Sequence, residues 1–155
     1  MLVGLISDTH NLLRPEAAAA LEGVDQILHA GDIGDRSILE SLNKIAPTTA
    51  VRGNVDTAPW TKQLPETELI ELEGASLYVI HDLSKLDLNP EAAGIAAVIY
   101  GHSHQPKIEE KKGVFYINPG SAGPKRFNLP ISLGKLRADR GRITAELIDL
   151  TPVVS

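Results

Sequence analysis

The sequence contains no cysteine, and this absence limits the chemistry open to it. Disulfide bonds and zinc sites built from thiolates are both excluded. A metal ion, if one binds, must therefore be held by oxygen atoms and imidazole nitrogens. A chain without cysteine is also compatible with a reducing compartment, so we expect a cytoplasmic location.

Long apolar stretches and surplus positive charge are missing as well. No segment approaches the roughly 20 apolar residues of a membrane span, so we expect no membrane association. No secretory signal is visible, because the short apolar run at residues 2–6 leads directly into polar residues 7–10. The formal net charge of −5 argues against strong binding to a nucleic-acid backbone, whereas a small phosphorylated ligand is compatible with it.

The length and composition are those of a globular protein. A chain of 155 residues with 43% hydrophobic and 23% charged residues can bury one core. We find no internal repeat, low-complexity tract or linker in it. We therefore expect a single domain over residues 1–155.

The first third of the chain alternates short apolar strands with helices. Strands are predicted at residues 2–6, 25–29 and 48–51, and helices at residues 14–22 and 36–45. This alternation indicates parallel strands joined by right-handed crossovers.

The rest of the chain favours antiparallel pairing. Hairpins are predicted over residues 68–80, 107–117 and 131–150, with a further strand at residues 96–99. A loop with a weak helix is predicted at residues 83–93. The predicted fold class is therefore α/β (α+β).

Side chains that bind metals follow the predicted strands. They are Asp8, His10, Asp32, Asn54, His81, His102 and His104. Ligands collect outside the carboxyl ends of parallel strands, so we expect these residues to lie together on one sheet edge. The fifth histidine, His29, is expected to be hydrogen-bonded in or near the core.

Seven ligands exceed the about four to six, water included, that one transition metal uses. Two ions that share Asp32 would use all of them, because a carboxylate has two oxygen atoms. Paired ions roughly 3.5 to 4 Å apart activate a hydroxide between them and stabilise a phosphoryl group during in-line displacement. The pattern therefore indicates hydrolysis of a phosphate ester.

Five ordered motifs resemble the calcineurin-like metallophosphoesterase superfamily. They are Asp8-x-His10, Gly31-Asp32, Gly53-Asn54-x-Asp56, a lone His81 and Gly101-His102-Ser103-His104. Residues 7–11 (SDTHN), 29–32 (HAGD), 118–121 (NPGS) and 124–126 (PKR) resemble the small bacterial and archaeal phosphodiesterase branch of that superfamily.

This resemblance implies a two-sheet β-sandwich flanked by helices and a centre with two divalent metal ions. It assigns one metal to Asp8, His10, Asp32 and His104, and the other to Asp32, Asn54, His81 and His102. Catalysis would involve Asp32, Asn54 and His102, acting through the metals and a bridging hydroxide. Mn²⁺ is the favoured metal, with Zn²⁺, Fe²⁺, Ni²⁺ and Co²⁺ as alternatives.

Two positions depart from the family pattern. Many members have a histidine after the asparagine, where it protonates the leaving group, but this chain has Val55. The narrower branch tends to have His-Gly-His where this chain has His81-Asp82-Leu83, so the second histidine, which would help to hold the phosphate, is missing and an acid has entered. We expect diesters to be hydrolysed faster than monoesters, because Asp82 repels a monoester dianion more strongly.

Other charged residues have two interpretations each. Asp56 is expected either to accept a hydrogen bond from a ligand imidazole or to cap its own turn. Asp35 is expected to cap the following helix. Lys125 and Arg126 either contribute positive charge near a phosphodiester or form a solvated basic pair.

A second hypothesis is a binding module. It is a metallophosphoesterase-like scaffold, similar to the vacuolar-sorting retromer subunit, that binds partner proteins with little or no catalysis. Val55 and Asp82 favour it, whereas a full set of buried ligands without a metal would be costly to retain. The partner expected for the enzyme is a small phosphorylated substrate, and the apolar, hairpin-rich second half would suit a homo-oligomer surface.

Overall fold

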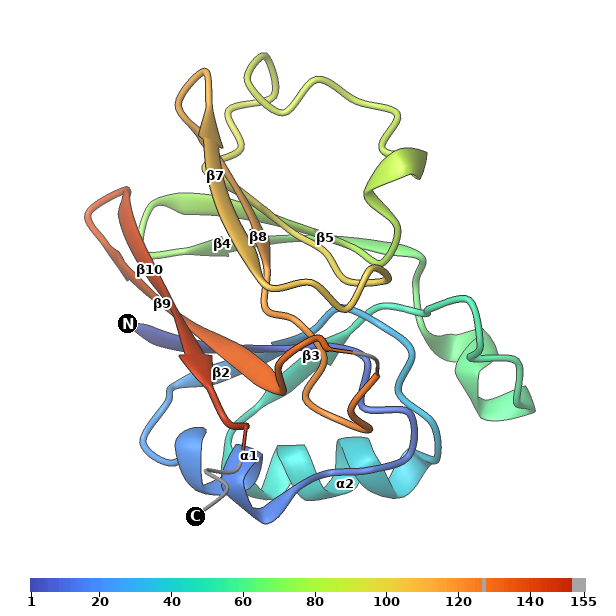
Figure 1. Cartoon of the computed structure of the whole chain (residues 1–155). Coiled ribbons are helices and arrows are strands. Elements are labelled where there is room, and N and C mark those ends of the chain that lie inside the picture. The colour runs from blue at the N-terminus through green and yellow to red at the C-terminus, as the bar shows by residue number, and fades with distance from the viewer. Residues whose placement is uncertain (127, 152–155) are drawn as a thin grey trace.

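Figure 1 shows the computed structural model of the chain, which describes residues 1–126 and 128–151. Two five-stranded sheets pack face to face, and two helices cover the outer face of the first sheet. This arrangement confirms the two-sheet fold expected from the sequence. No helix in the described part of the chain is long and apolar enough to cross a membrane.

The first sheet has the strand order β10-β9-β1-β2-β3. Its strands are β1 (Leu2–Ile6), β2 (Gln26–His29), β3 (Thr48–Ala50), β9 (Ser132–Asp139) and β10 (Arg142–Asp149). As the alternation of strands and helices predicts, β1, β2 and β3 are parallel, whereas β9 runs antiparallel to β1. The three parallel strands therefore place their carboxyl ends at one edge of this sheet.

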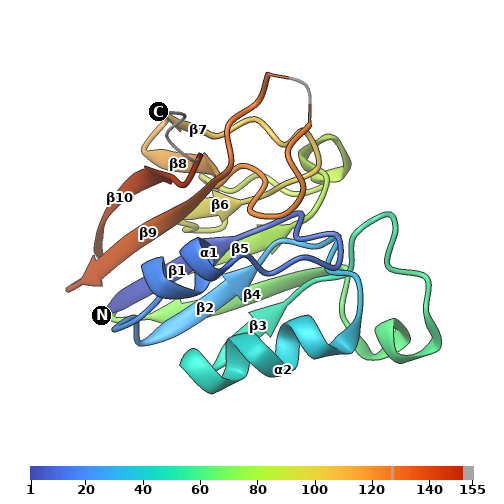
Figure 2. The ribbon, with the colours of Figure 1, turned by 60° about the horizontal axis from the view of Figure 1, so that its bottom comes forward.

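Both α-helices lie on the same face of the first sheet (Figure 2). α1 (Pro15–Ala20) is shorter than predicted, and α2 (Arg36–Ile45) has the predicted bounds. The Asp35 carboxylate accepts a hydrogen bond from Ser37 N, which confirms its role as an N-cap. A side chain at Gly4 of β1 would collide with Leu21, so this glycine lets the end of α1 pack directly on the sheet.

The second sheet has the strand order β4-β5-β6-β8-β7. Its strands are β4 (Thr67–Leu72), β5 (Ala75–Ile80), β6 (Ala97–Ile99), β7 (Lys107–Lys111) and β8 (Val114–Asn118). β5, β6 and β8 are parallel, and the edge strands β4 and β7 pair with them in antiparallel orientation. The second sheet thus also contains parallel strands that end in a common direction.

All three predicted hairpins form, as β4–β5, β7–β8 and β9–β10. Their turns are Glu73-Gly74, Lys112-Gly113 and Arg140-Gly141, and both residues of each turn have positive φ. This backbone matches the twist of the strands that flank a two-residue turn.

Alternation along β1 and β5 defines the core. Leu5 and Leu77 are fully buried between the two sheets, whereas Ile6 packs toward the helices. The outer face of the second sheet, which includes Tyr78, is covered by side chains of the segment that follows β5.

Two segments outside the sheets form short 3₁₀ turns. These are η1 (Pro59–Gln63), in the region predicted as a loop, and η2 (Leu83–Lys85). The weak helix predicted at residues 83–93 is wrong, because only η2 and a turn at residues 90–94 form there. Side-chain oxygens of Asp82 and Asn89 bind backbone amides in this segment, which favours turns over a continuous helix.

Candidate metal centre

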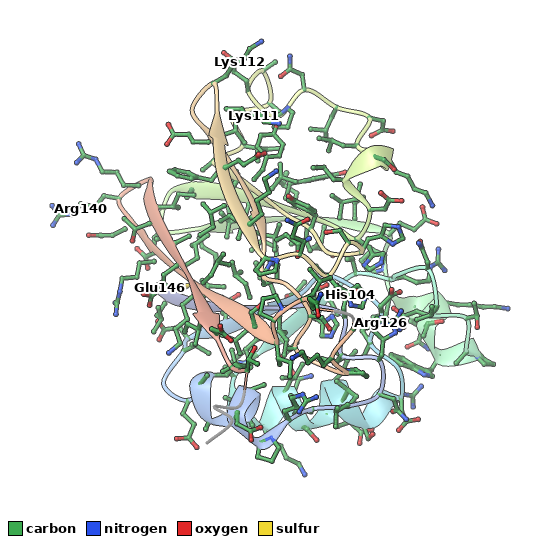
Figure 3. All side chains as sticks on the ribbon, in the orientation of Figure 1. His104, Lys111, Lys112, Arg126, Arg140 and Glu146 are labelled. Atoms are coloured by element: carbon green, nitrogen blue, oxygen red, sulfur yellow. The ribbon has the colours of Figure 1, made fainter. Side chains whose placement is uncertain are left out.

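Loops from both sheets converge at one end of the sandwich. β1, β2 and β3 lead into residues 8–10, 31–34 and 53–56, and β5 and β6 lead into residues 81–82 and 101–104. Figure 3 shows His104 within this group of loops.

The expectation that all seven candidate ligands share one sheet edge is therefore wrong. Four of them follow strands of the first sheet, and the histidines His81, His102 and His104 follow strands of the second. The seven still converge, because both sheets direct the carboxyl ends of parallel strands to the same end of the molecule.

The backbone at this end is unusual. Five of the seven candidate ligands have positive φ, with values of 56° for Asp8, 43° for His10, 58° for Asp32, 74° for His102 and 62° for His104. Non-glycine residues seldom adopt this conformation, and it persists only where the surrounding structure enforces it. Its concentration here marks a functional region.

The first cluster consists of Asp8, His10 and His104. Asp8 Oδ1 lies 3.7 Å from His10 Nε2 and 3.5 Å from His104 Nε2, and the two rings are stacked with centroids 5.2 Å apart. The other Asp8 oxygen, Oδ2, accepts hydrogen bonds from Ser7 Oγ and His102 N. These bonds fix the carboxylate so that Oδ1 faces the two imidazoles.

The second cluster consists of Asp32, His81 and His102, with Asn54 beside it. His81 Nδ1 lies 2.7 Å from the carbonyl oxygen of Ala30, so that nitrogen donates, and Nε2 faces Asp32 Oδ2 at 3.1 Å. Asn54 Nδ2 lies 3.1 Å from His102 Nδ1. The Ala30 carbonyl thereby sets the orientation in which His81 presents Nε2.

Asp32 lies between the two clusters. Its Oδ2 atom is 3.6 Å from His10 Nε2 of the first cluster and 3.1 Å from His81 Nε2 of the second. Its Oδ1 atom instead accepts a hydrogen bond from Val55 N. Asp32 thus presents a single oxygen to both clusters, whereas the sequence argument invoked both of its oxygens.

The charges of this pair are coupled. Burial opposes ionisation of Asp32, but the contact with His81 and the bond from Val55 N outweigh it and lower the pKa of Asp32 to about 2. Burial also disfavours the charged form of His81, yet the Asp32 carboxylate outweighs it and raises the pKa of His81. Asp32 is therefore an anion at neutral pH, as a ligand for a cation must be.

Within residues 1–126 and 128–151, four buried polar atoms of the two clusters have no hydrogen-bond partner. They are Asp8 Oδ1, His10 Nε2, His81 Nε2 and His104 Nδ1. Buried groups of this kind are costly unless something satisfies them, and carboxylate oxygens with imidazole nitrogens suit divalent cations. The donor set therefore fits metal ions.

Asp56 does not bind an imidazole in the described part of the chain. Its two oxygens accept from the backbone amides of Asp32, Ile33 and Gly53 at 2.8–2.9 Å, and from Gly34 N at 3.4 Å. The imidazole interpretation is wrong, and Asp56 does more than cap its own turn. The carboxylate, in a residue only 5% exposed, joins the loop that carries Asp32 to the loop that carries Asn54.

His29 connects two other parts of the centre. Gly31 N donates to His29 Nδ1 at 3.0 Å, so Nε2 carries the proton and donates to Thr9 Oγ1 at 3.0 Å. Thr9 Oγ1 in turn donates to the carbonyl oxygen of Ile33. The expectation of a hydrogen-bonded core histidine is confirmed, but His29 also links the Asp8–His10 loop to the Asp32 loop.

The two departures from the family pattern lie at the rim. Val55 is 54% exposed. Asp82 caps η2, because its Oδ1 accepts from Ser84 N and Oγ. The bond from Ser84, together with the nearby His102, lowers the pKa of Asp82 and keeps it ionised.

Arg126, on the loop after β8, lies near His104 (Figure 3). Burial, followed by the positive charge of Arg126, lowers the pKa of His104. The loop is anchored to the centre because Ala122 N donates to Ser7 O and Ser121 Oγ donates to Asp8 O. Arg126 and Lys125 are both exposed, so the solvated interpretation holds for Lys125, whereas the charge of Arg126 also acts on His104.

Sequence reasoning did not assign roles to Ser7, Thr9 or Asn118. Asn118 Nδ2 lies within 3.2 Å of both Gly101 O and Ser103 Oγ, which supports the loop of His102 and His104. All three residues lie inside the motifs SDTHN and NPGS, which was the available signal. Their partners are far away in the chain, so the motifs alone do not reveal them.

Two facing sheets with oxygen and imidazole ligands at their carboxyl ends define a metal-binding β-sandwich. Comparison with known proteins agrees, because the model of the calcineurin-like phosphoesterase superfamily domain matches residues 1–141. The chain belongs to this superfamily.

Individual relatives are similar over most or part of the chain. The sequence is 36% identical over 163 residues to the probable metallophosphoesterase MJ0623 of Methanocaldococcus jannaschii, covering 97% of this chain and 82% of that protein. It is 32% identical over 115 residues to phosphodiesterase YfcE of Escherichia coli, covering 66% of this chain and 59% of that protein. Among solved structures, a single-site variant of Vps29 from Entamoeba histolytica aligns with a TM-score of 0.77 and 21% identity over 97% of this chain and 100% of that chain, a likeness of fold.

We predict that Asp56→Asn weakens metal binding about 10- to 100-fold, because the two loops lose their common anchor. The single amide oxygen cannot replace two charged acceptors, so the free energy of unfolding should also fall by about 3 kcal/mol. Titration calorimetry with Mn²⁺ and denaturant unfolding measure the two effects. The control is Asp35→Asn, where asparagine caps as well as aspartate and both quantities should stay unchanged. Wild-type metal affinity in Asp56→Asn would refute the positioning role.

A second prediction concerns acid stability. Burial, only partly offset by nearby carboxylates, lowers the pKa of His29 from 6.5 to about 4. The unfolded chain thus binds a proton between these values that the folded chain does not. Stability of the metal-free protein should therefore fall as pH drops from 6.5 to about 4, by about 3 kcal/mol from His29 alone.

Denaturant unfolding in EDTA at a series of pH values measures this dependence. His29→Gln should be less stable at neutral pH but should show a shallower loss of stability on acidification. The matched control Glu146→Gln, in the exposed strand β10, should retain the wild-type slope. Identical slopes for His29→Gln and the wild type would contradict the prediction.

Proposed function

We propose that this protein is a phosphodiesterase that uses two divalent cations, one held by each cluster. The observation that carries the proposal is Asp32, whose single free oxygen faces His10 on one side and His81 on the other. A carboxylate in that position would be a ligand available to both ions. The name of the Escherichia coli relative, a phosphodiesterase, supports the reaction class.

The ligand assignment proposed is the one expected from the sequence. Asp8, His10 and His104 complete one site with Asp32, while Asn54, His81 and His102 complete the other. When bound, two such cations would supply positive charge to the phosphoryl group and activate the attacking water. Mn²⁺ is proposed as the metal, since oxygen and imidazole ligands accept it readily. A cytoplasmic location and a homo-oligomer are also retained as proposals.

The chain's own residues govern how the substrate is held. Asn54 contacts His102 of the second cluster, where a phosphoryl oxygen would be bound. Arg126, on the loop after β8, adds positive charge near His104 of the first cluster. The carboxylate of Asp82, kept ionised by Ser84, disfavours a monoester dianion more than a diester monoanion. Diesters are therefore the proposed substrates.

Metal analysis and turnover together test this proposal. The wild-type protein loaded with manganese should contain about two Mn²⁺ per chain and hydrolyse bis(p-nitrophenyl) phosphate. Asp32→Ala should lose both metals and at least 100-fold in rate, because it removes the shared ligand. His104→Ala should mainly lose one metal.

The control for these variants is Glu146→Ala, which lies in β10 away from the centre. His29 is unsuitable as a remote control, because it is hydrogen-bonded to Thr9 between two candidate ligands. Less than one metal per chain and no turnover in added manganese would overturn the enzyme hypothesis. A stable stoichiometric partner, retained by ligand variants, would instead favour the scaffold similar to Vps29.

A further prediction follows from Val55. With valine at this position, no side chain there protonates the leaving group, so the rate should depend steeply on the pKa of the departing alcohol. Val55 is 54% exposed, so histidine can replace it without a steric clash in the core. Val55→His should flatten the dependence of kcat/KM on leaving-group pKa in a series of aryl phosphodiesters.

Leu69→His is the matched control, since Leu69 is similarly exposed, at 55%, but lies on β4. It should retain the steep dependence. If Val55→His retains it as well, residue 55 does not reach the leaving oxygen.

A further inference from the structure

The strand β10 is the longest of the four edge strands of the two sheets. It has eight residues, contains neither proline nor glycine, and pairs with β9 without a bulge. The other edge strands, β3, β4 and β7, have three, six and five residues. Figure 2 shows β10 at the outer margin of the ribbon. A long, regular edge of this kind can pair with a further strand.

The outward backbone groups of β10 are available for such pairing. Leu150 N donates to Ile131 O, so the even-numbered residues of β10 bond to β9 in the alternating antiparallel ladder. The N–H and C=O groups of Ile143, Ala145 and Leu147 therefore point away from the sheet. In the part of the chain that the structure describes, no other backbone group binds them.

The apolar layer between the two sheets is incompletely covered on this side. Ile143 and Ala145 point inward from β10, and Ile108 points inward from β7, the nearby edge strand of the second sheet. All three side chains pack against the core, yet each of them is only half-buried. A second chain placed along this edge would remove more of their apolar surface from water.

Two copies of β10 can use these groups by pairing antiparallel around a two-fold axis. Residues that face each other in an antiparallel ladder have the same hydrogen-bonding role, so the axis must pass through a residue. An axis at Thr144 sets Ile143 of each copy against Ala145 of the other. Each of these pairs would exchange two N–H···O bonds through the outward groups described above.

Charge favours an axis at Thr144 over the neighbouring positions. This axis places Arg142 of each copy directly opposite Glu146 of the other. An axis at Ala145 would place Arg142 opposite Ile148, and an axis at Glu146 would set two carboxylates against each other. Opposite charges that face each other across strands stabilise the pairing, whereas like charges weaken it.

The same axis extends a row of charges that exists within one chain. Glu146 lies opposite Lys135 of β9, and Arg142 lies opposite Asp139. Arg142 and Glu146 are exposed, and among the described residues neither side chain forms an ion pair. Across the two copies the row would run Lys135, Glu146, Arg142 and Asp139, with the sign of the charge alternating from strand to strand.

We propose that β10 pairs with β10 of a second copy of this chain around an axis at Thr144, which joins the first sheets of both copies. Thr144 lies in one row with Arg137 of β9 and Leu2, the first residue of β1. The interface is therefore at the end of the sandwich opposite the metal centre, and Figure 3 shows Glu146 away from His104. Loss of the dimer should leave metal content and turnover per chain unchanged.

Analytical ultracentrifugation of the full chain over a concentration series tests this interface. The wild type should sediment as a dimer at the upper concentrations. Arg142→Glu sets acids against acids across the axis, and Glu146→Arg sets bases against bases, so each variant alone should dimerise about tenfold more weakly or worse. An equimolar mixture of the two variants should recover the dimer, because the mixed pair has an acid opposite a base at both positions.

The controls make the same changes of charge at exposed positions outside β10. They are Lys112→Glu, in the turn between β7 and β8, and Glu40→Arg, on α2, and both should dimerise like the wild type. Ala145→Pro tests the backbone pairing without a change of charge. It removes an outward N–H and no bond to β9, so circular dichroism should show a retained fold while the dimer is lost.

A wild type that stays monomeric at every concentration would overturn the inference. A dimer that neither charge reversal weakens would also overturn it, as would a mixture of the two variants that remains as monomeric as each variant alone. The measurement uses neither metal nor turnover, so its result is separate from that of the phosphodiesterase proposal.

Discussion

The carboxylate of Asp56 holds the loop of Asp32 to the loop of Asn54 through four backbone amides, and the geometry of the candidate centre depends on it. With the two loops joined, Val55 N reaches one oxygen of Asp32 and leaves the other facing both clusters. A charged acceptor is needed here, because a neutral side chain cannot satisfy several buried amides at once. The residue that joins the clusters is thus oriented before any ligand arrives.

This preorganisation has an energetic cost that a cation would offset. Four buried polar atoms without a partner among the described residues, and positive φ at five candidate ligands, both destabilise the protein in the absence of a ligand. This destabilisation is spread over loops from both sheets, and the packed core beneath them holds these loops in place. Loops under such constraint need support from residues that touch no ligand, as His29 and Asn118 illustrate.

The fold itself does not decide the function, since the structure of a protein named for vacuolar sorting, which is 21% identical to this chain, has the same fold. The chemistry of the side chains at the carboxyl ends of the strands separates the enzyme hypothesis from the scaffold hypothesis.

Much of the fold and the set of candidate ligands could be predicted from the sequence, because these features depend on local patterns. Apolar runs predicted all ten strands to within a few residues, and helical periodicity predicted α2 with its Asp35 cap. Glycine-containing turns between strand-like runs predicted the three hairpins, and their residues adopt the positive φ such turns need. The polar residues that follow these strands contained the whole set of candidate ligands. Residues 83–93 misled the prediction, because side-chain oxygens compete for the backbone amides that a helix would use.

Only the tertiary structure decided how these parts meet. Both sheets supply candidate ligands because their faces pack together. This packing places His102 N against Asp8, although the two residues are 94 positions apart in the chain. The bond between Thr9 and His29 and the four amides bound by Asp56 likewise join distant segments. Residue order determined the types of side chain available and the ends of the strands that carry them. Their partners were set by burial of the common core, because non-local contacts form only once the sheets pack and fix the loops in space.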